Sequence, residues 1–222
     1  MAVRIGVLSP HTVPLPDVNE AFSRLWPEAV ITHLVDDSLY LEWGGKTAEL
    51  PPVLKDRVAR LLAYCATTGP DAILVTGSVF CRIVEEVRGE IKVPVVTATE
   101  GLVQAAFRAG KKLGIVTTSP FSLADLKRDL ERYAQKHGLE YTVEGLVDAE
   151  ARRVILEDKD RDRHDAMVAA TVARLPDVDA ILLGQFSLTT AYMKMLGQAQ
   201  VPVLAASATS IARLKEVTGA RT

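Results

Sequence analysis

Short apolar runs alternate along the chain with longer segments in which apolar residues recur every three or four positions. The short runs predict strands near residues 4–8, 30–35, 72–75 and 93–96, and again near 113–117, 141–146, 180–183 and 201–204. The helical spacing predicts helices over 17–25, 52–65, 79–88 and 100–108, then 122–136, 150–156, 163–174, 189–196 and 207–217. Because short apolar strands separated by helices pair in parallel, the pattern predicts sheets covered by helices on both faces.

The two halves of the chain repeat one another. VRIGVLS at residues 3–9 is similar to KKLGIVTT at 111–118, DAIL occurs at both Asp71 and Asp179, and VPVV at Val93 returns as VPVL at Val201. All three matches have a spacing of 108 residues. The repeat predicts an α/β protein of two pseudo-twofold-related lobes, residues 1–98 and 99–206, each with a four-stranded parallel sheet and with the active site in a cleft between them. Residues 207–222 are expected to complete the first lobe.

Composition excludes several classes of function. The 222 residues carry a net charge of −2 and no basic cluster, which argues against nucleic acid as a partner. No run approaches the roughly 18 apolar residues of a membrane span, and the apolar start of the chain is too short for a signal peptide. Two cysteines make no disulfide framework, so a cytoplasmic location is expected. No CxxC or HExxH motif is present, and we expect neither a metal nor a cofactor.

Polar residues follow the third predicted strand of the first half. Thr76, Gly77 and Ser78 end the strand and Val79 begins the next helix. A helix start offers unpaired N–H groups, and glycine lets a ligand approach the backbone closely, so the turn is suited to a carboxylate. We therefore predict that Gly77, Ser78 and Val79 bind substrate. The alternative is a plain strand-to-helix turn capped by serine.

The first strand of each half ends in a similar way. In the first half, Ser9 and His11 follow this strand. We predict that Ser9 binds substrate. We predict that His11 acts as an acid or base, because histidine titrates near neutrality. In the second half, the corresponding strand is followed by Thr117, Thr118 and Ser119, which are also predicted to bind substrate. The pair Ser119-Pro120 is equally typical of an ordinary helix start.

The turn at 185–187 is the counterpart of the Gly77 turn. Gln185 can both donate and accept a hydrogen bond, so we predict a catalytic role in orienting a ligand or stabilising an oxyanion. Phe186 is expected to form a wall of the pocket or part of the core. Ser187 is expected to bind substrate or to cap its helix.

These residues carry a resemblance to a known family. The duplicated chain, the segment VPVVTATEGLVQAAFRAGKKLGIVTTSPFSL and the later DAILLGQFSL and ILEDKDRDRHDAMV resemble the aspartate/glutamate/hydantoin racemase superfamily, especially its hydantoin-racemase-like branch. The resemblance implies a cofactor-independent isomerase of amino acid metabolism, a small carboxylate or hydantoin-like ligand, and a homodimer or larger homo-oligomer. It also implies a cysteine at each paired strand end, where this chain has Gly77 and Gln185. The implied two-thiol racemisation therefore does not carry over.

Three functions remain open at this point. One is isomerase-type chemistry at the carbon α to a carbonyl, without the cysteine pair. A second is decarboxylation of malonate-type acids, because the Gly77-Ser78 turn also resembles that of arylmalonate decarboxylase, whose single cysteine has no counterpart at Gln185. The third is a non-catalytic protein that binds carboxylates.

Other titratable residues are expected to lie outside the site. Cys65 and Cys81 are predicted to be buried, and His164 is predicted to lie on a solvated charged face. Asp36, Asp37 and Glu42 are expected to lie on a long loop after the second predicted strand, and this loop is a candidate lid.

Overall fold

The computed structural model describes residues 2–44 and 50–220. The chain forms two compact units, each described by itself. Unit 1 comprises Met1–Ala98 and Ser210–Thr222, and unit 2 comprises Thr99–Thr209.

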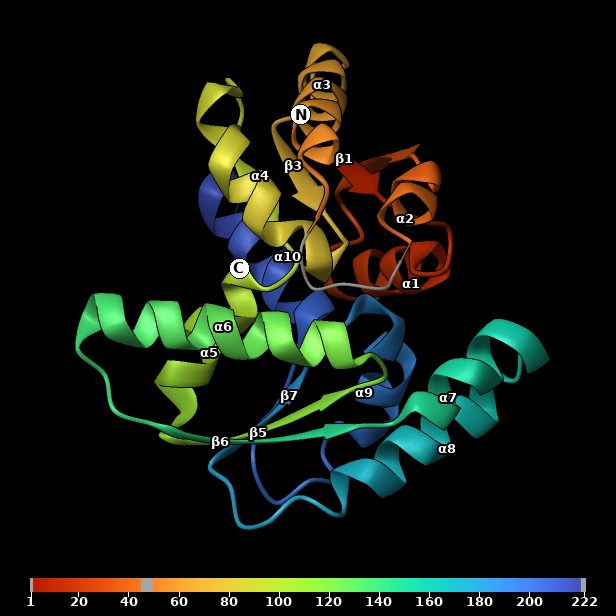
Figure 1. Ribbon diagram of the computed structural model, residues 1–222, viewed down its shortest axis with the longest axis vertical. Helices are drawn as coiled ribbons and strands as arrows, with labels where there is room; N and C mark the ends of the chain where they lie inside the picture. The colour runs from red at the N-terminus through yellow and green to blue at the C-terminus, as the bar shows by residue number, and fades with distance from the viewer. Residues whose placement is uncertain (1, 45–49, 221–222) are drawn as a thin grey trace. The chain divides into compact units, whose positions relative to one another are not determined.

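Unit 1 is built on a parallel sheet with the strand order β2-β1-β3-β4. Figure 1 labels its two central strands, β1 and β3. Its strands are β1 (Arg4–Ser9), β2 (Val30–Val35), β3 (Ala72–Val75) and β4 (Val95–Thr97). Its helices are α1 (Leu15–Leu25), α2 (Ser38–Trp43), α3 (Pro52–Thr67), α4 (Cys81–Val87) and the larger part of α10 (Ala206–Thr218), with 3₁₀ turns at η1 (Ser78–Phe80) and η2 (Arg88–Glu90). Lys215 of α10 donates to the Leu25 carbonyl at 3.0 Å, which ties the end of the chain to α1.

Unit 2 has the same strand order, β6-β5-β7-β8. Its strands are β5 (Lys112–Thr117), β6 (Thr142–Val147), β7 (Ala180–Leu183) and β8 (Val203–Ala205). Its helices are α5 (Glu100–Ala109), α6 (Pro120–His137), α7 (Ala149–Arg153), α8 (Arg161–Val172) and α9 (Thr189–Met195), with a π-helical turn η3 (Val154–Asp158) and a 3₁₀ turn η4 (Phe186–Leu188). The predicted α/β class, with two parallel four-stranded sheets flanked by helices, is confirmed.

The sequence repeat is also a repeat of hydrogen bonds. In unit 1 the Asp71 amide donates to the Arg4 carbonyl at 2.7 Å, and in unit 2 the Asp179 amide donates to the Lys112 carbonyl at the same distance. Both aspartates also accept a side-chain bond from the amide of that same partner residue. Asp71 and Asp179, which are 108 positions apart, therefore make the same two hydrogen bonds at the start of the strand pairs β1–β3 and β5–β7.

Burial follows the position of each strand in its sheet. Every residue of the inner strands β3 and β7 is buried, whereas the edge strands β2 and β6 remain partly exposed. In unit 2, α6 packs on β5 and β6 while α8 lies on the opposite side of the sheet, as Figure 1 shows. Double coverage explains why the inner strands read as unbroken apolar runs. Within residues 2–44 and 50–220 no helix has the length and apolarity needed to cross a bilayer.

The expectation of a long loop after β2 was wrong over its described part. Residues Ser38–Trp43 form the short helix α2. Arg57 of α3 pairs with Asp36 at 2.8 Å and with Glu42 at 3.0 Å, and it also donates to the Ser38 hydroxyl. The two carboxylates therefore attach α2 to α3 through a shared guanidinium.

Candidate functional site

The strand β3 of unit 1 ends in a tight turn. Gly77 precedes the 3₁₀ turn η1 with an extended backbone, and its carbonyl accepts from the Phe80 amide at 3.0 Å. Ser78 and Val79 begin this 3₁₀ turn and are buried. The chain therefore passes from strand to α4 through Gly77, as predicted, although the first step is a 3₁₀ turn.

Gly77 has no room for a side chain. A Cβ built at this position would meet Cγ of Pro10 at 2.4 Å and Cδ2 of Phe80 at 3.0 Å. Real Cβ atoms do not approach other atoms this closely, and a proline ring has few ways to move aside. Pro10 therefore fills the space that a larger residue at position 77 would need, and it also shows that the turns after β1 and β3 lie in contact.

The hydroxyls at the ends of β1 and β3 bond to each other. Thr76 donates its hydroxyl proton to the Ser9 hydroxyl oxygen at 2.9 Å, and both residues are buried. Ser9 is thus placed next to the Gly77 turn, as the sequence predicted, and its oxygen already has one partner. Its role toward a ligand remains a prediction.

His11 lies in an aromatic cluster beside these turns. Its ring packs edge-on against the ring of Tyr40 in α2, with the ring centroids 4.6 Å apart. Tyr40 in turn packs edge-on against Phe80, with 5.5 Å between the ring centroids. Nδ1 of His11 accepts from the Val13 amide at 3.3 Å, so the neutral ring carries its proton on Nε2. In this tautomer Nε2 of His11 donates a proton, and Nδ1 becomes available as a base only if the Val13 bond is released.

The corresponding turn of unit 2 follows β7. The Gln185 carbonyl accepts from the Leu188 amide at 3.2 Å, which repeats the Gly77–Phe80 bond 108 residues later. Gln185 therefore takes the structural place of Gly77, and here the position has room for a long side chain.

The side chain of Gln185 is held by Thr118. Its Oε1 accepts from the Thr118 amide at 2.6 Å and from the Thr118 hydroxyl at 3.1 Å. The Gln185 amide nitrogen makes no hydrogen bond to residues 2–44 or 50–220. Gln185 is partly exposed while Thr118 is buried, so the NH₂ group is the unsatisfied part of this pair.

The remaining predicted residues of unit 2 surround that pair. Thr117 is buried and donates to the Ser119 carbonyl at 3.0 Å, and Ser119 occupies the N-cap of α6 without a side-chain cap bond. Phe186 is buried. Ser187 lies inside η4 and is not the N-cap of α9. Binding roles for these residues stay predictions, and the structure gives Phe186 the burial of a core residue.

Arg161 is a neighbour of this turn that the sequence did not single out. The first residue of α8, it donates from Nη1 to the Ser187 carbonyl at 3.2 Å. In the sequence it lies within the charge run KDRDRHD, where nothing separates it from surface arginines. This bond places the Arg161 guanidinium against the backbone of the Gln185 turn.

The prediction for His164 was wrong, because His164 is fully buried. Its Nδ1 lies 2.9 Å from Oδ1 of Asp165, which also accepts from the Thr190 hydroxyl at 2.9 Å, while Lys194 lies 3.0 Å from Oδ2. Burial alone would raise the pKa of the Asp165 carboxyl, but the bonds from His164, Lys194 and Thr190 outweigh it and hold that pKa below its usual value. Asp165 thus joins α8 to α9, the helix that follows the Gln185 turn.

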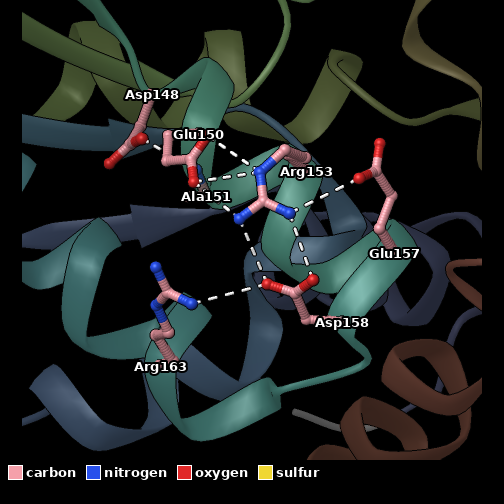
Figure 2. Close-up of polar contacts among 7 residues, drawn as sticks. All are labelled: Asp148, Glu150, Ala151, Arg153, Glu157, Asp158 and Arg163. Atoms are coloured by element: carbon pink, nitrogen blue, oxygen red, sulfur yellow. Dashed lines mark hydrogen bonds and ion pairs between the residues drawn. The ribbon is translucent and has the colours of Figure 1, made fainter.

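The charged segment around η3 is a surface network. Arg153 pairs with Glu150 at 2.8 Å, with Asp158 at 3.1 Å and with Glu157 at 3.4 Å, and Arg163 reaches Asp158 at 3.4 Å (Figure 2). Exposed pairs of this kind contribute little stability individually. Since these charges neutralise one another, this segment offers no evident ligand site.

Both thiols are buried, as predicted. Cys65 lies on α3, and burial raises the pKa of its thiol. Cys81 lies one helical turn beyond Gly77, and its Sγ is 3.8 Å from the Gly77 carbonyl. No cysteine stands at position 77 or 185.

The described residues contain no group of three or more His, Cys, Asp or Glu side chains placed to hold a metal.

Comparison with known proteins now identifies the family. The family model described as Asp/Glu/Hydantoin racemase matches residues 37–214. The chain belongs to the Asp/Glu/hydantoin racemase family. A search of curated proteins found no match.

Solved structures share the fold at low sequence identity. Allantoin racemase from Klebsiella pneumoniae is 15% identical with a TM-score of 0.70, covering 98% of this chain and 88% of that one. An aspartate racemase homologue from Pyrococcus horikoshii is 17% identical with a TM-score of 0.69, covering 99% and 100%. Arylmalonate decarboxylase is 17% identical with a TM-score of 0.66, covering 99% and 94%. At these identities the structural likeness shows the fold of this family member and leaves its chemistry open.

Proposed function

We propose that this racemase-family chain is an enzyme that binds a small carboxylate or cyclic amide at its strand-end turns and acts at the carbon α to a carbonyl without a cysteine pair. The observation that carries the proposal is the paired turn itself. Gly77 and Gln185 keep the same backbone hydrogen bond, to Phe80 and Leu188, while neither brings a thiol. This pairing supports a site with the family's architecture in which the implied acid–base groups are replaced.

The side chains at these turns suit stabilisation of a negative oxygen. The NH₂ group of Gln185 favours an enolate or carboxylate oxygen in unit 2. An amide is not a useful base, so Gln185 holds the ligand and does not take its proton. In unit 1, His11 is the candidate acid–base residue, and the Val13 bond selects the neutral tautomer with its proton on Nε2.

Decarboxylation of malonate-type acids is the second candidate, and it is favoured because it requires one acid, for which His11 is the candidate, and no separate base. Loss of CO₂ from a malonate leaves the bonding electron pair on the α carbon as an enolate, so no base has to remove a proton first. The enolate then needs only a proton donor: an imidazolium at His11 would give up its Nε2 proton and return to the neutral ring, whose Nδ1 accepts from Val13. Isomerisation needs in addition a base that removes the α proton. Nδ1 of His11 could act as that base only after its hydrogen bond from Val13 is released.

A panel of amino acids, hydantoins and aryl- or alkylmalonates in D₂O tests the proposal. Deuterium incorporation at the α carbon supports isomerase-type chemistry, and CO₂ release from malonates supports decarboxylation. His11→Asn is expected to lower either rate at least about a hundredfold, while His137→Asn, at the exposed end of α6, leaves it unchanged. Tight binding without exchange or CO₂ release would instead identify a non-catalytic carboxylate-binding protein.

A further inference from the structure

The amide of Gln185 has only one satisfactory orientation. Its Oε1 receives two donors from a single residue, the Thr118 amide at 2.6 Å and the Thr118 hydroxyl at 3.1 Å. The backbone N–H cannot accept a hydrogen bond, so a flipped amide would set its NH₂ group against that donor. The chemistry of Thr118 therefore assigns oxygen to the inner position of Gln185 and nitrogen to the outer one.

This orientation decides what a ligand meets. The Gln185 oxygen is already used, and its NH₂ group has no partner in the parts of the chain described, residues 2–44 and 50–220. An unpaired amide nitrogen offers two donors and no acceptor. A ligand group beside it gains a hydrogen bond if it carries an acceptor oxygen, and an ammonium group there would face donors only.

We propose that Gln185 is a specificity-determining residue that selects ligands with a carboxylate or carbonyl oxygen, and that Thr118 is the residue that positions it. The proposal rests on the proposed function, because it names what the 185 position contributes to that site. It also accounts for glutamine at this position: the side chain is long enough to bond Thr118 and still presents a donor. Glycine, found at the paired position 77, does neither.

Gln185→Glu is the most direct variant, because it changes an NH₂ donor into a charged acceptor with almost no change of shape. One carboxylate oxygen keeps both Thr118 bonds, and the other faces the ligand. Binding of malonate, measured by calorimetry, is expected to weaken at least about tenfold, since a donor is lost and a like charge is added. Gln200→Glu adds the same charge at an exposed position of unit 2 and is the matched control, with unchanged malonate affinity.

The role of Thr118 is tested through the side-chain resonances of Gln185. In ¹⁵N-labelled wild-type protein, the NH₂ pair of Gln185, identified by its disappearance in Gln185→Glu, is expected to shift on addition of malonate or hydantoin. Thr118→Val keeps the backbone donor and removes the hydroxyl. We therefore expect it to reduce the affinities for malonate and for hydantoin about threefold to tenfold. Thr118→Ser restores the hydroxyl and should restore binding. Thr142→Val, at the exposed start of β6, controls for the change of side chain.

The outcomes separate this proposal from the proposed function. If wild type binds malonate or hydantoin but Gln185→Glu binds malonate equally well, the specificity role of Gln185 is overturned and the binding function stands. Equal affinities in Thr118→Val and wild type would overturn the positioning role of Thr118. If neither probe binds wild type, the proposed function fails and the inference fails with it.

Discussion

Cγ of Pro10 lies 2.4 Å from the point where a Cβ on residue 77 would stand. The glycine that replaces the family's expected cysteine is thus matched by a proline on the neighbouring turn. Gly77 has ordinary negative φ, so it is required here for space and not for backbone conformation. A thiol at residue 77 would have to displace Pro10.

Gly77→Ala is therefore expected to destabilise the protein by about 1–3 kcal/mol through overpacking. Pro10→Ala should relieve much of this cost, so the two substitutions are predicted to be strongly coupled in a double-mutant cycle. Urea unfolding of wild type, both single variants and the double variant measures the coupling. Gly89→Ala is the control, because a Cβ there meets nothing within 4 Å. Strictly additive effects of the Pro10 and Gly77 changes would show that the contact carries no strain.

Asp165→Asn is expected to destabilise the protein by about 1.5–3 kcal/mol at pH 7, because Asn cannot replace a buried charged acceptor for Lys194, Thr190 and His164. The pKa of Asp165 is lowered in the folded protein, so its stabilisation is complete above the unfolded value near 4 and declines as pH falls through the lower folded-state pKa. Urea unfolding from pH 7 down to pH 3 should show the difference between wild type and variant shrinking below about pH 4.

Asp162→Asn is the matched control for that experiment. Asp162 also pairs with Lys194, at 2.7 Å, but its side chain is 93% exposed. Its loss is expected to cost less than about 0.5 kcal/mol at pH 7. A difference between Asp165→Asn and wild type that stays constant down to pH 3 would contradict the assignment of the stabilisation to the ionised carboxyl.

The two thiols are expected to be unreactive in the native protein. Cys65 and Cys81 are 3% and 2% exposed, and burial raises the pKa of Cys65, so little accessible thiolate is present at pH 8. An aromatic disulfide reagent should react slowly with folded protein and release two equivalents after unfolding. Gln200→Cys, which adds an exposed thiol, should give one rapid equivalent. Rapid labelling of native Cys81 would place a reactive sulfur beside the Gly77 turn.

Much of the fold could be predicted from the sequence. The 108-residue repeat and the apolar strand runs predicted both sheets, and β2, β3 and β7 were predicted to the residue. The helix α2 was missed because its six residues carry little local signal. Arg57, which is distant in sequence, holds it through Asp36 and Glu42.

The polar contacts were less predictable. His164 was expected on a charged surface because its neighbours in sequence are charged, yet the helical period places it in line with Val168 and Thr171 on the buried face of α8. The pairing of Gln185 with Thr118 joins residues 67 positions apart and depends on β5 lying beside β7. The repeat predicted that both turns lie at strand ends, but the choice of hydrogen-bond partner emerges only from the packed structure.

The central claim is that this racemase-family protein uses its strand-end turns without sulfur chemistry. The most direct test is the rate of α-carbon deuteration and of CO₂ release for the double variant Cys65→Ala/Cys81→Ala, verified as folded by circular dichroism, against wild type on the same substrate panel. We predict that the wild type converts at least one member and that the cysteine-free variant keeps its rate within about threefold, since neither thiol takes part. Loss of activity in the folded variant, or an inert wild type, would contradict the account.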